Sequence, residues 1–353
     1  MQTIVHEAGY HYISPLLHEI DTFYRDTSEK SIKSTGKGLL WGRYHRSFFP
    51  LWEIFKDHGY DYELSFYGER NLPKIDISGI DKKNIIVCFS GGKDSVAAAL
   101  HYKKLGYNVF LFHVKHINSQ YDEYIACEEL ADYLDMPLYI EDIKLSGRND
   151  WIEHPMKNMI IANCALNYGI RTEIAYKIAF GNYYTSMLSD NDFESTAGDC
   201  RDMWDAYEHI IQTIIPKFKI YMCLPNAGTT LNRVCTDPKL LNKTISCIGR
   251  TGLRQYRHDW ILNKFGVELP AKRCGSCYKC AIEYIYRADK GLTPFNEKYY
   301  TYCLQVCYNQ LVKWGDYAID IDDLWSKFLF YKKSAHCKDI VLENGKVFST
   351  NNT

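Results

Sequence analysis

The sequence predicts an α/β protein with a doubly wound parallel sheet, a small zinc-knuckle lobe, and helical N- and C-terminal extensions. From residue 84 onward, short apolar segments alternate with amphipathic ones, and a glycine-rich loop separates the first such pair. A C-x2-C-x2-C cluster follows near residue 280. We therefore expect a mainly helical extension over residues 1–80, an α/β domain with its knuckle over 84–290, and a helical extension over 291–353.

The N-terminal extension contains two amphipathic segments. LLHEIDTFYRDT (16–27) and FFPLWEIFKDHGY (48–60) have apolar residues three to four positions apart, which indicates helices that bury one face. NLPKIDISGIDKKN (71–84) contains a proline and several turn-forming residues, which is typical of a linker. The α/β pattern begins only after this linker.

The α/β domain is predicted as strands and helices in turn. IIVCFS and NVFLFHV are apolar and suit buried strands, whereas DSVAAALHYKKLG and DEYIACEELADYLD have helical spacing. The expected order is strand 85–90, helix 94–106, strand 108–114, helix 122–135, strand 137–142, helix 158–170, and a segment 172–182 that enters a strand at KIAFG. Buried strands that alternate with helices of this length indicate a parallel sheet covered on both faces.

Composition disfavours several classes of protein. The 42 Lys and Arg nearly balance the 43 Asp and Glu, so the net charge of −1 gives no reason to require nucleic acid as a partner. The sequence has no run of about 18 apolar residues, as a membrane span needs, and its N-terminal residues lack the pattern of an export signal. We expect a cytoplasmic protein whose 13 cysteines are mostly reduced core residues plus a metal cluster.

The strongest chemical signal is SGGKDS, Ser90–Ser95, between the first strand and the first helix of the domain. Its two glycines let the backbone approach a ligand, and amides at a helix N-terminus favour a phosphate. Ser90 and Ser95 add hydroxyl groups and Lys93 adds a positive charge. Asp94 stands where a Walker A loop needs Ser or Thr, so transfer of a γ-phosphoryl group is disfavoured. The simpler alternative is a glycine turn in a sheet that binds no nucleotide.

These residues resemble the signature of the PP-loop ATP pyrophosphatase superfamily, whose members cleave ATP between the α- and β-phosphates. The resemblance implies an adenine-nucleotide α-hydrolase-like fold whose loop holds the leaving pyrophosphate together with Mg²⁺. The implied ATP-binding residues of the loop are Ser90, Gly91, Gly92, Lys93, Asp94 and Ser95, of which the last three act in catalysis. The ends of the first two strands, including His113 and Val114, are implied to frame the adenosine.

The second signal is RCGSCYKC, in which Cys274, Cys277 and Cys280 are spaced so that three thiolates can converge on one ion at the turn into a helix. Gly275 gives the backbone freedom for that turn. Tetrahedral Zn²⁺ needs a fourth ligand, and Cys247 in TISCIGR is our choice. The competitors are Cys235, Cys303 and Cys307. Reduced thiols without a metal and an iron–sulfur cluster with an open iron are the alternatives.

The third signal lies between these two, in the polar loop that follows the strand ending at Gly181 and leads into a helix. Ligands of α/β sheets bind at such positions. Asp199, Arg201 and Asp202 gather opposite charges beside the helix start, where they would orient a planar heterocycle and its carboxylate. A capping cluster with a surface ion pair is an equally good interpretation.

Together the three motifs resemble the 7-cyano-7-deazaguanine synthase (QueC) family over about residues 84–285. The order is the same: SGG-x-DS, then a strand-ending glycine with a polar loop that closes in DCR, then CGxCxxC. The matching residues are Asp199, Cys200 and Arg201 near the substrate and Cys274, Cys277 and Cys280 around the zinc. Gly181 and Asp202 complete the expected substrate site.

The sequence departs from this family at several places. The family's first zinc cysteine lies shortly before CGxC, where this chain has Phe265, so Cys247 serves only if residues 248–272 form an insertion. Lys93 replaces the more usual Gln or Leu, and the family's Arg-Asn pair is represented by KN at 157–158. The N- and C-terminal extensions have no counterpart in the family's compact enzyme.

The resemblance implies ATP-dependent adenylation of a carboxylic acid, a deazapurine such as 7-carboxy-7-deazaguanine, with capture by ammonia or an amine. The implied cofactors are ATP, Mg²⁺ and a structural Zn²⁺. The terminal extensions are candidates for contacts in a homodimer or with a partner protein. The alternatives are a PP-loop tRNA thiolase, a sulfonucleotide reductase, and a nucleotide-binding sensor or scaffold of a phage-defence or DNA-modification system.

Overall fold

The computed structural model describes residues 4–6, 12–26, 42–57, 64–68, 72–116, 121–143, 157–183, 201–224, 234–245, 251–270, 272–315, 340–343 and 346–349. By its internal contacts the chain divides into two units. The first unit comprises Met1–Ser90 and Asp94–Thr230, and the second comprises Gly91–Lys93 and Leu231–Thr353. None of the helices in the described residues is long and apolar enough to cross a membrane.

A six-stranded parallel sheet organises the first unit, in the order β1-β6-β5-β4-β7-β8. Its strands are β1 (Ile4–His6), β4 (Asn84–Cys88), β5 (Asn108–His116), β6 (Leu138–Ile143), β7 (Lys177–Tyr183) and β8 (Lys219–Leu224). From the central strand β4 the chain adds β5 and β6 on one side and β7 and β8 on the other. The order therefore reverses next to β4, and ligands of doubly wound sheets bind at such a switch point.

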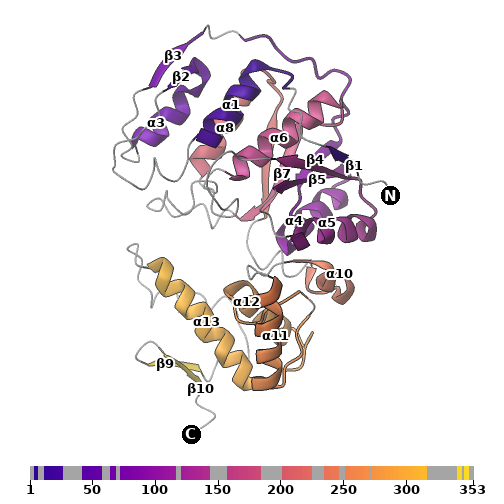
Figure 1. Ribbon diagram of the computed structural model, residues 1–353, viewed down its shortest axis with the longest axis vertical. Coiled ribbons are helices and arrows are strands. Elements are labelled where there is room, and N and C mark those ends of the chain that lie inside the picture. Colours follow the sequence, from indigo (N-terminus) through magenta and orange to yellow (C-terminus); the bar gives the residue numbers. More distant parts are fainter. Residues whose placement is uncertain are drawn as a thin grey trace. The chain divides into compact units, whose positions relative to one another are not determined.

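Helices cover both faces of this sheet, as the sequence predicts. They are α1 (Pro15–Asp26), α4 (Lys93–Lys104), α5 (Tyr121–Leu134), α6 (Lys157–Arg171) and α8 (Arg201–Gln212). In Figure 1, α4 and α5 lie on one side of the sheet, and α1, α6 and α8 lie on the other. The doubly wound parallel α/β fold predicted from residues 84–183 is thus confirmed.

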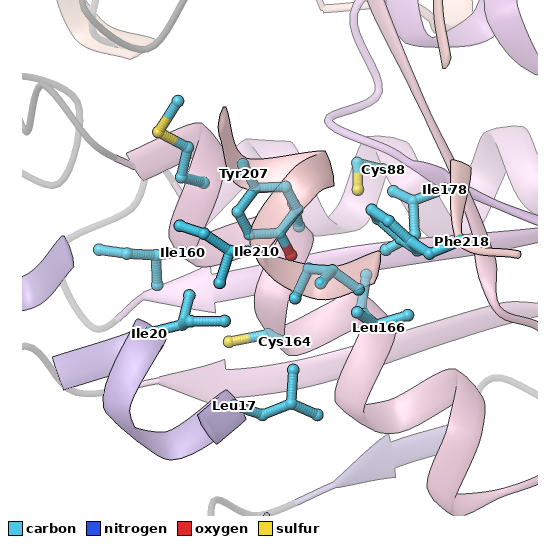
Figure 2. Packing of buried hydrophobic residues seen from close by; sticks show 14 of the residues in the cluster. Leu17, Ile20, Cys88, Ile160, Cys164, Leu166, Ile178, Tyr207, Ile210 and Phe218 are labelled. Atoms are coloured by element: carbon cyan, nitrogen blue, oxygen red, sulfur yellow. The ribbon is translucent and has the colours of Figure 1, made fainter. Parts of the chain in front are cut away.

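Apolar side chains from distant segments form the core between the sheet and α1, α6 and α8. Leu17 and Ile20 of α1 lie near Cys164 of α6, and Tyr207 of α8 belongs to the same buried cluster (Figure 2). Asn163 of α6 also donates a hydrogen bond to Leu17 O at 3.0 Å, which ties the two helices together. The N-terminal residues are therefore part of the core of the first unit.

The N-terminal region contains more strand than the sequence predicts. Helices α1 and α3 (Phe49–Asp57), with a 3-10 turn η1 (Arg46–Phe48) before α3, confirm the two amphipathic segments. However, β1 joins the main sheet beside β6, and β2 (Gly42–His45) pairs with β3 (Leu64–Tyr67) in a parallel two-stranded sheet. Strands of three or four residues are too short to show a period, and their pairing depends on residues far away in the chain. Residues 72–80 carry no helix or strand, and the segments before and after them belong to the same unit.

The second unit is mostly helical in its described part. It contains α10 (Pro238–Lys243), α11 (Thr251–Phe265), α12 (Tyr278–Asp289), α13 (Glu297–Gly315) and an antiparallel pair of strands, β9 (Ile340–Glu343) and β10 (Lys346–Ser349). The sequence predicts a boundary near residue 290 and a helical C-terminal region. The division by contacts falls after Thr230, and the last two strands, β9 and β10, pair antiparallel.

Candidate functional site

The loop Ser90–Ser95 connects the end of β4 to the first turn of α4. Gly91 has a φ of +70°, a conformation that residues with side chains rarely adopt. The Oγ of Ser95 accepts a hydrogen bond from Ser90 N at 3.3 Å and lies 3.4 Å from Ser90 Oγ, so the loop closes on itself. The side chain of Lys93 is buried. A glycine turn that leads into a helix N-terminus and carries a lysine is an arrangement suited to phosphate groups.

Gly181 of β7 lies directly against this loop. A Cβ atom at residue 181 would stand 2.3 Å from Asp94 O and 2.7 Å from Ser95 N, closer than real Cβ atoms approach. Only glycine therefore lets β7 pass so close to the first turn of α4. The sequence assigns Gly181 to the substrate, and the structure gives it a contact with the loop backbone.

His113 lies on β5 and is buried beside the residue that leads into the loop. Its Nδ1 is 2.8 Å from Phe89 O and 3.5 Å from Cys127 Sγ. A carbonyl oxygen only accepts hydrogen bonds, so we assign the proton to Nδ1, which leaves Nε2 as an acceptor. Among the described residues Nε2 has no hydrogen-bond partner. Burial is the main cause that lowers the pKa of His113 from 6.5 to about 4, so the ring is neutral near pH 7.

Val114 follows His113 on β5 and belongs to the core cluster that contains Phe112 and Tyr168. Successive side chains of a strand point to opposite faces of a sheet. The side chains of His113 and Val114 therefore lie on different faces of β5 and do not form one wall. Of these two side chains, that of His113 presents a polar atom, Nε2, which could accept a hydrogen bond from an N–H or O–H group of a ligand.

The predicted substrate loop is described only in part. Asp199 and Cys200 lie outside the described residues. Arg201 is the first residue of α8, and its side chain also lies outside the described part. Asp202, in the first turn of α8, is exposed. The structure thus leaves the DCR element as a prediction.

Asp202 lines a groove of about 600 Å³ between α3 and α8, both in the first unit. Asp205 and His209 continue its α8 wall, and Trp52 and Glu53 form part of its α3 wall. Three carboxylates give this groove an acidic character, which suits a ligand with N–H donors or a positive charge. The sequence does not predict this groove, because α3 and α8 are separated by more than a hundred residues and meet only in the fold.

Cys274, Cys277 and Cys280 come together in the second unit, as the sequence predicts. Their sulfur atoms all lie within 4.8 Å of one another, and those of Cys274 and Cys280 are 3.9 Å apart. Zn–S bonds of about 2.3 Å in a tetrahedron separate the sulfurs by about 3.8 Å. All three residues are buried, and the donor set suits Zn²⁺, so the residues present fit the ion.

Gly275 makes the turn between the first two of these cysteines. Its φ is +70°, and a Cβ there would stand 2.4 Å from Leu269 Cδ1. Tyr299 of α13 donates its hydroxyl proton to Gly275 O at 2.7 Å. The backbone of the knuckle is therefore held from outside by α13.

The three other cysteines considered for the fourth metal ligand lie in the described part of the chain, and none of them belongs to the group of Cys274, Cys277 and Cys280. Among the described residues that could ligate a metal, the group contains only Cys274, Cys277 and Cys280. The competitors Cys235, Cys303 and Cys307 are buried elsewhere. Cys247 lies outside the described residues, so its assignment stays a prediction.

A buried ion pair that the sequence does not predict lies beside the knuckle. Arg273, which directly precedes Cys274, places its Nε 2.9 Å from both carboxylate oxygens of Glu283 on α12. Both side chains are almost fully buried. The only sequence signal was an arginine and a glutamate next to apolar residues and cysteines, and such charges are common at surfaces as well.

No protein-family model matches the chain, and the comparison with curated proteins gives no match. Among solved structures, it is similar to NMN synthetase from Francisella tularensis, with 13% identity and a TM-score of 0.33 over 60% of this chain and 88% of that chain. It is also similar to a predicted subunit of tRNA methyltransferase from Methanocaldococcus jannaschii DSM, with 19% identity and a TM-score of 0.29 over 54% and 90% of the two chains. The strand order and the parallel pairing of the sheet define the fold.

Proposed function

We propose that the protein is a PP-loop enzyme that adenylates a carboxylic acid at the expense of ATP, releases pyrophosphate, and passes the acyl group to ammonia or an amine. The substrate class that we propose is a 7-deazapurine acid such as 7-carboxy-7-deazaguanine, as in the 7-cyano-7-deazaguanine synthases. The observation that carries the proposal is the SGGKDS loop between β4 and α4, at the switch point of the sheet. The sulfur cluster of the second unit supports the likeness to that family.

In the proposed first step, a carboxylate oxygen of the substrate attacks the α-phosphorus of ATP. The bond from the α-phosphorus to the bridging oxygen breaks, and pyrophosphate leaves with the electron pair. Lys93 and the hydroxyl groups of Ser90 and Ser95 would stabilise the charge that gathers on the leaving group, a contribution of about 10²–10³ in rate per donor. Mg²⁺, held by pyrophosphate and Asp94, would supply further positive charge.

In the second step, the nitrogen of ammonia or an amine attacks the acyl carbon. The C–O bond to AMP breaks, AMP leaves, and the nitrogen loses a proton, which yields an amide. In the family reaction a second ATP activates the amide oxygen and gives the nitrile. The thiolates of Cys274, Cys277 and Cys280 would hold Zn²⁺ as a structural ion at the knuckle and take no part in these steps.

One observation weakens the thiolase alternative. A thiolase needs reactive cysteines near the carboxyl ends of the strands, and Cys88 is the cysteine at the end of β4. Cys88 is buried, and burial raises its pKa well above the usual value, so its thiolate is disfavoured. We therefore prefer acyl adenylation to sulfur transfer.

The test is turnover by the full-length protein with ATP, Mg²⁺, ammonium and 7-carboxy-7-deazaguanine. We expect AMP and pyrophosphate in equal amounts, and only when the acid is present. Lys93→Met is the matched inactive variant. Formation of ADP and phosphate would contradict the proposal, and ATP binding without turnover of any deazapurine acid would favour the sensor or scaffold.

The terminal regions remain the proposed place for contacts in a homodimer or with a partner protein.

A further inference from the structure

The guanidinium of Arg273 fixes the end of α10. Besides its contact with Glu283, its Nη1 donates to Thr244 O at 2.6 Å, and its Nη2 donates to Thr244 Oγ1 at 2.8 Å and to Leu241 O at 3.3 Å. Thr244 is the C-cap of α10, and the last carbonyl groups of a helix have no partner within it. A six-residue helix is also too short to be stable by itself. Arg273 therefore determines where the chain after α10 lies.

The peptide unit between Thr244 and Ile245 is held at both ends. Thr244 O accepts from Arg273, and Ile245 N donates to Gly91 O at 2.8 Å. Gly91 belongs to the same unit as these residues. In a trans peptide the C=O and N–H groups point in opposite directions within one rigid plane. A shift of Arg273 would therefore tilt the plane that bonds to Gly91.

Gly91 O is in turn part of the peptide unit that carries the N–H of Gly92. Fixing the direction of that carbonyl fixes the direction of the Gly92 N–H, because the two lie in one plane. Fixing the direction of this carbonyl matters because Gly91, with a φ of +70° and no side chain, could otherwise adopt several backbone conformations. The orientation of loop amides decides whether they point at a phosphate.

We propose that Arg273 is a positioning residue for the phosphate-binding loop, acting through the Thr244–Ile245 peptide on Gly91. The inference rests on the proposed function, because it takes the loop to be the site of the ATP phosphates. The Arg273–Glu283 pair is buried, and a buried ion pair adds little net stability compared with apolar residues. The contribution of the pair is geometric. Glu283 holds the Arg273 side chain in place, and Arg273 in turn holds the Thr244–Ile245 peptide that bonds to Gly91.

The sharpest test replaces one backbone N–H. Ile245→Pro removes the donor to Gly91 O, and Thr244, with φ −72° and ψ 147°, already has the conformation that precedes a proline. Ile245→Val is the matched control, because it keeps the N–H and removes one methylene group. The probe is an ATP analogue with a methylene group between the α- and β-phosphates, titrated by calorimetry with Mg²⁺. We expect about tenfold weaker binding for Ile245→Pro and wild-type affinity for Ile245→Val.

A second variant tests the same link from the other end. Arg273→Lys keeps the positive charge but cannot bond Glu283 and Thr244 together. Arg287→Lys is its control, because Arg287 lies on α12, the helix that carries Glu283, and donates to Leu292 O, outside this network. We expect Arg273→Lys to weaken the analogue about tenfold and to raise the KM for ATP more than it lowers kcat, with the zinc content unchanged.

The outcomes separate the two proposals. Wild-type protein that does not bind the analogue contradicts the proposed function. Wild-type binding that Ile245→Pro and Arg273→Lys both retain, with intact folding and zinc, overturns the positioning role alone. If the proline variant fails to fold, Arg273→Lys decides: loss of zinc and affinity together would show a purely structural pair, and loss of affinity alone supports the link to the loop.

Discussion

Gly181 and Asp94 meet backbone to backbone: an ideal Cβ on Gly181 would stand 2.3 Å from the carbonyl oxygen of Asp94. This contact sets how closely β7 approaches the first turn of α4. Because Asp94 is part of the SGGKDS loop, the shape of the loop depends on a glycine almost ninety residues farther along the chain. A change in the packing at Gly181 should therefore change the binding of ATP at the loop.

The first prediction follows from this contact. Gly181→Ala should push β7 away from α4, at a cost of about 1–3 kcal/mol in the free energy of unfolding, and should weaken ATP binding. Urea unfolding and calorimetric titration measure the two effects. Gly79→Ala is the control, because a Cβ there meets nothing within 4 Å and should leave both quantities unchanged. A Gly181→Ala protein with wild-type stability would show that the strand moves aside at no cost.

The second prediction concerns the loop side chains. Asp94→Asn and Ser95→Ala should each abolish release of AMP and pyrophosphate, because both residues are proposed to contact the pyrophosphate and its Mg²⁺. The fold should survive, since the hydrogen-bond contacts between Ser95 and Ser90 are long, at 3.3 and 3.4 Å, and each is worth about 1 kcal/mol. Circular dichroism and a pyrophosphate assay check the two parts. Pyrophosphate release at the parent rate by either variant would refute the loop assignment.

Much of the fold could be predicted because its signals are local. β4, α4, β5 and α5 each begin within two residues of the predicted start, since apolar runs and helical spacing are visible in short windows. β1 could not be predicted, because Ile4–His6 becomes a strand only through its pairing with β6, more than 130 residues away. Non-local pairing leaves little trace in three residues.

The candidate site also has some features that local sequence patterns predict and others that only the fold brings together. The loop Ser90–Ser95 and the cysteines at 274, 277 and 280 were predicted because their spacing along the chain already sets their geometry. The contacts that hold them were not. Arg273 reaches Thr244 across 29 residues, and the Gly181 contact involves two backbones, so neither depends on a pattern that one sequence displays.

The third prediction concerns the metal. Purified protein should contain about one zinc ion per chain, because thiolates 3.9 Å apart in a buried cluster suit a tetrahedral ion. Cys277→Ser should lower the zinc content and the melting temperature. Cys307→Ala, a buried cysteine outside the cluster, is the control and should keep its zinc. Stoichiometric iron with visible absorbance would instead favour the thiolase alternative.

The fourth prediction is that Cys247 supplies the fourth thiolate. Arg273 holds Thr244 next to the knuckle, and residue 247 lies three positions farther on, a span of at most about 11 Å. Cys247→Ser should weaken zinc binding in a competition with a chelator, whereas Cys235→Ser should not. X-ray absorption should show four sulfur neighbours in the parent and three in Cys247→Ser. Four sulfurs in that variant would assign the position to another cysteine.

The last prediction uses the buried imidazole of His113. Its pKa falls from 6.5 to about 4 in the folded state, mainly through burial, so between these values the unfolded chain binds a proton that the native protein does not. The free energy of unfolding should therefore decrease as the pH falls through this window, by about 3 kcal/mol in all from this group. His113→Phe keeps an apolar ring but cannot be protonated, so the variant should lose less stability between pH 7 and pH 4 than the parent does. Urea unfolding at several pH values measures these slopes, and parallel curves for the parent and His113→Phe would mean that His113 is protonated in the native protein.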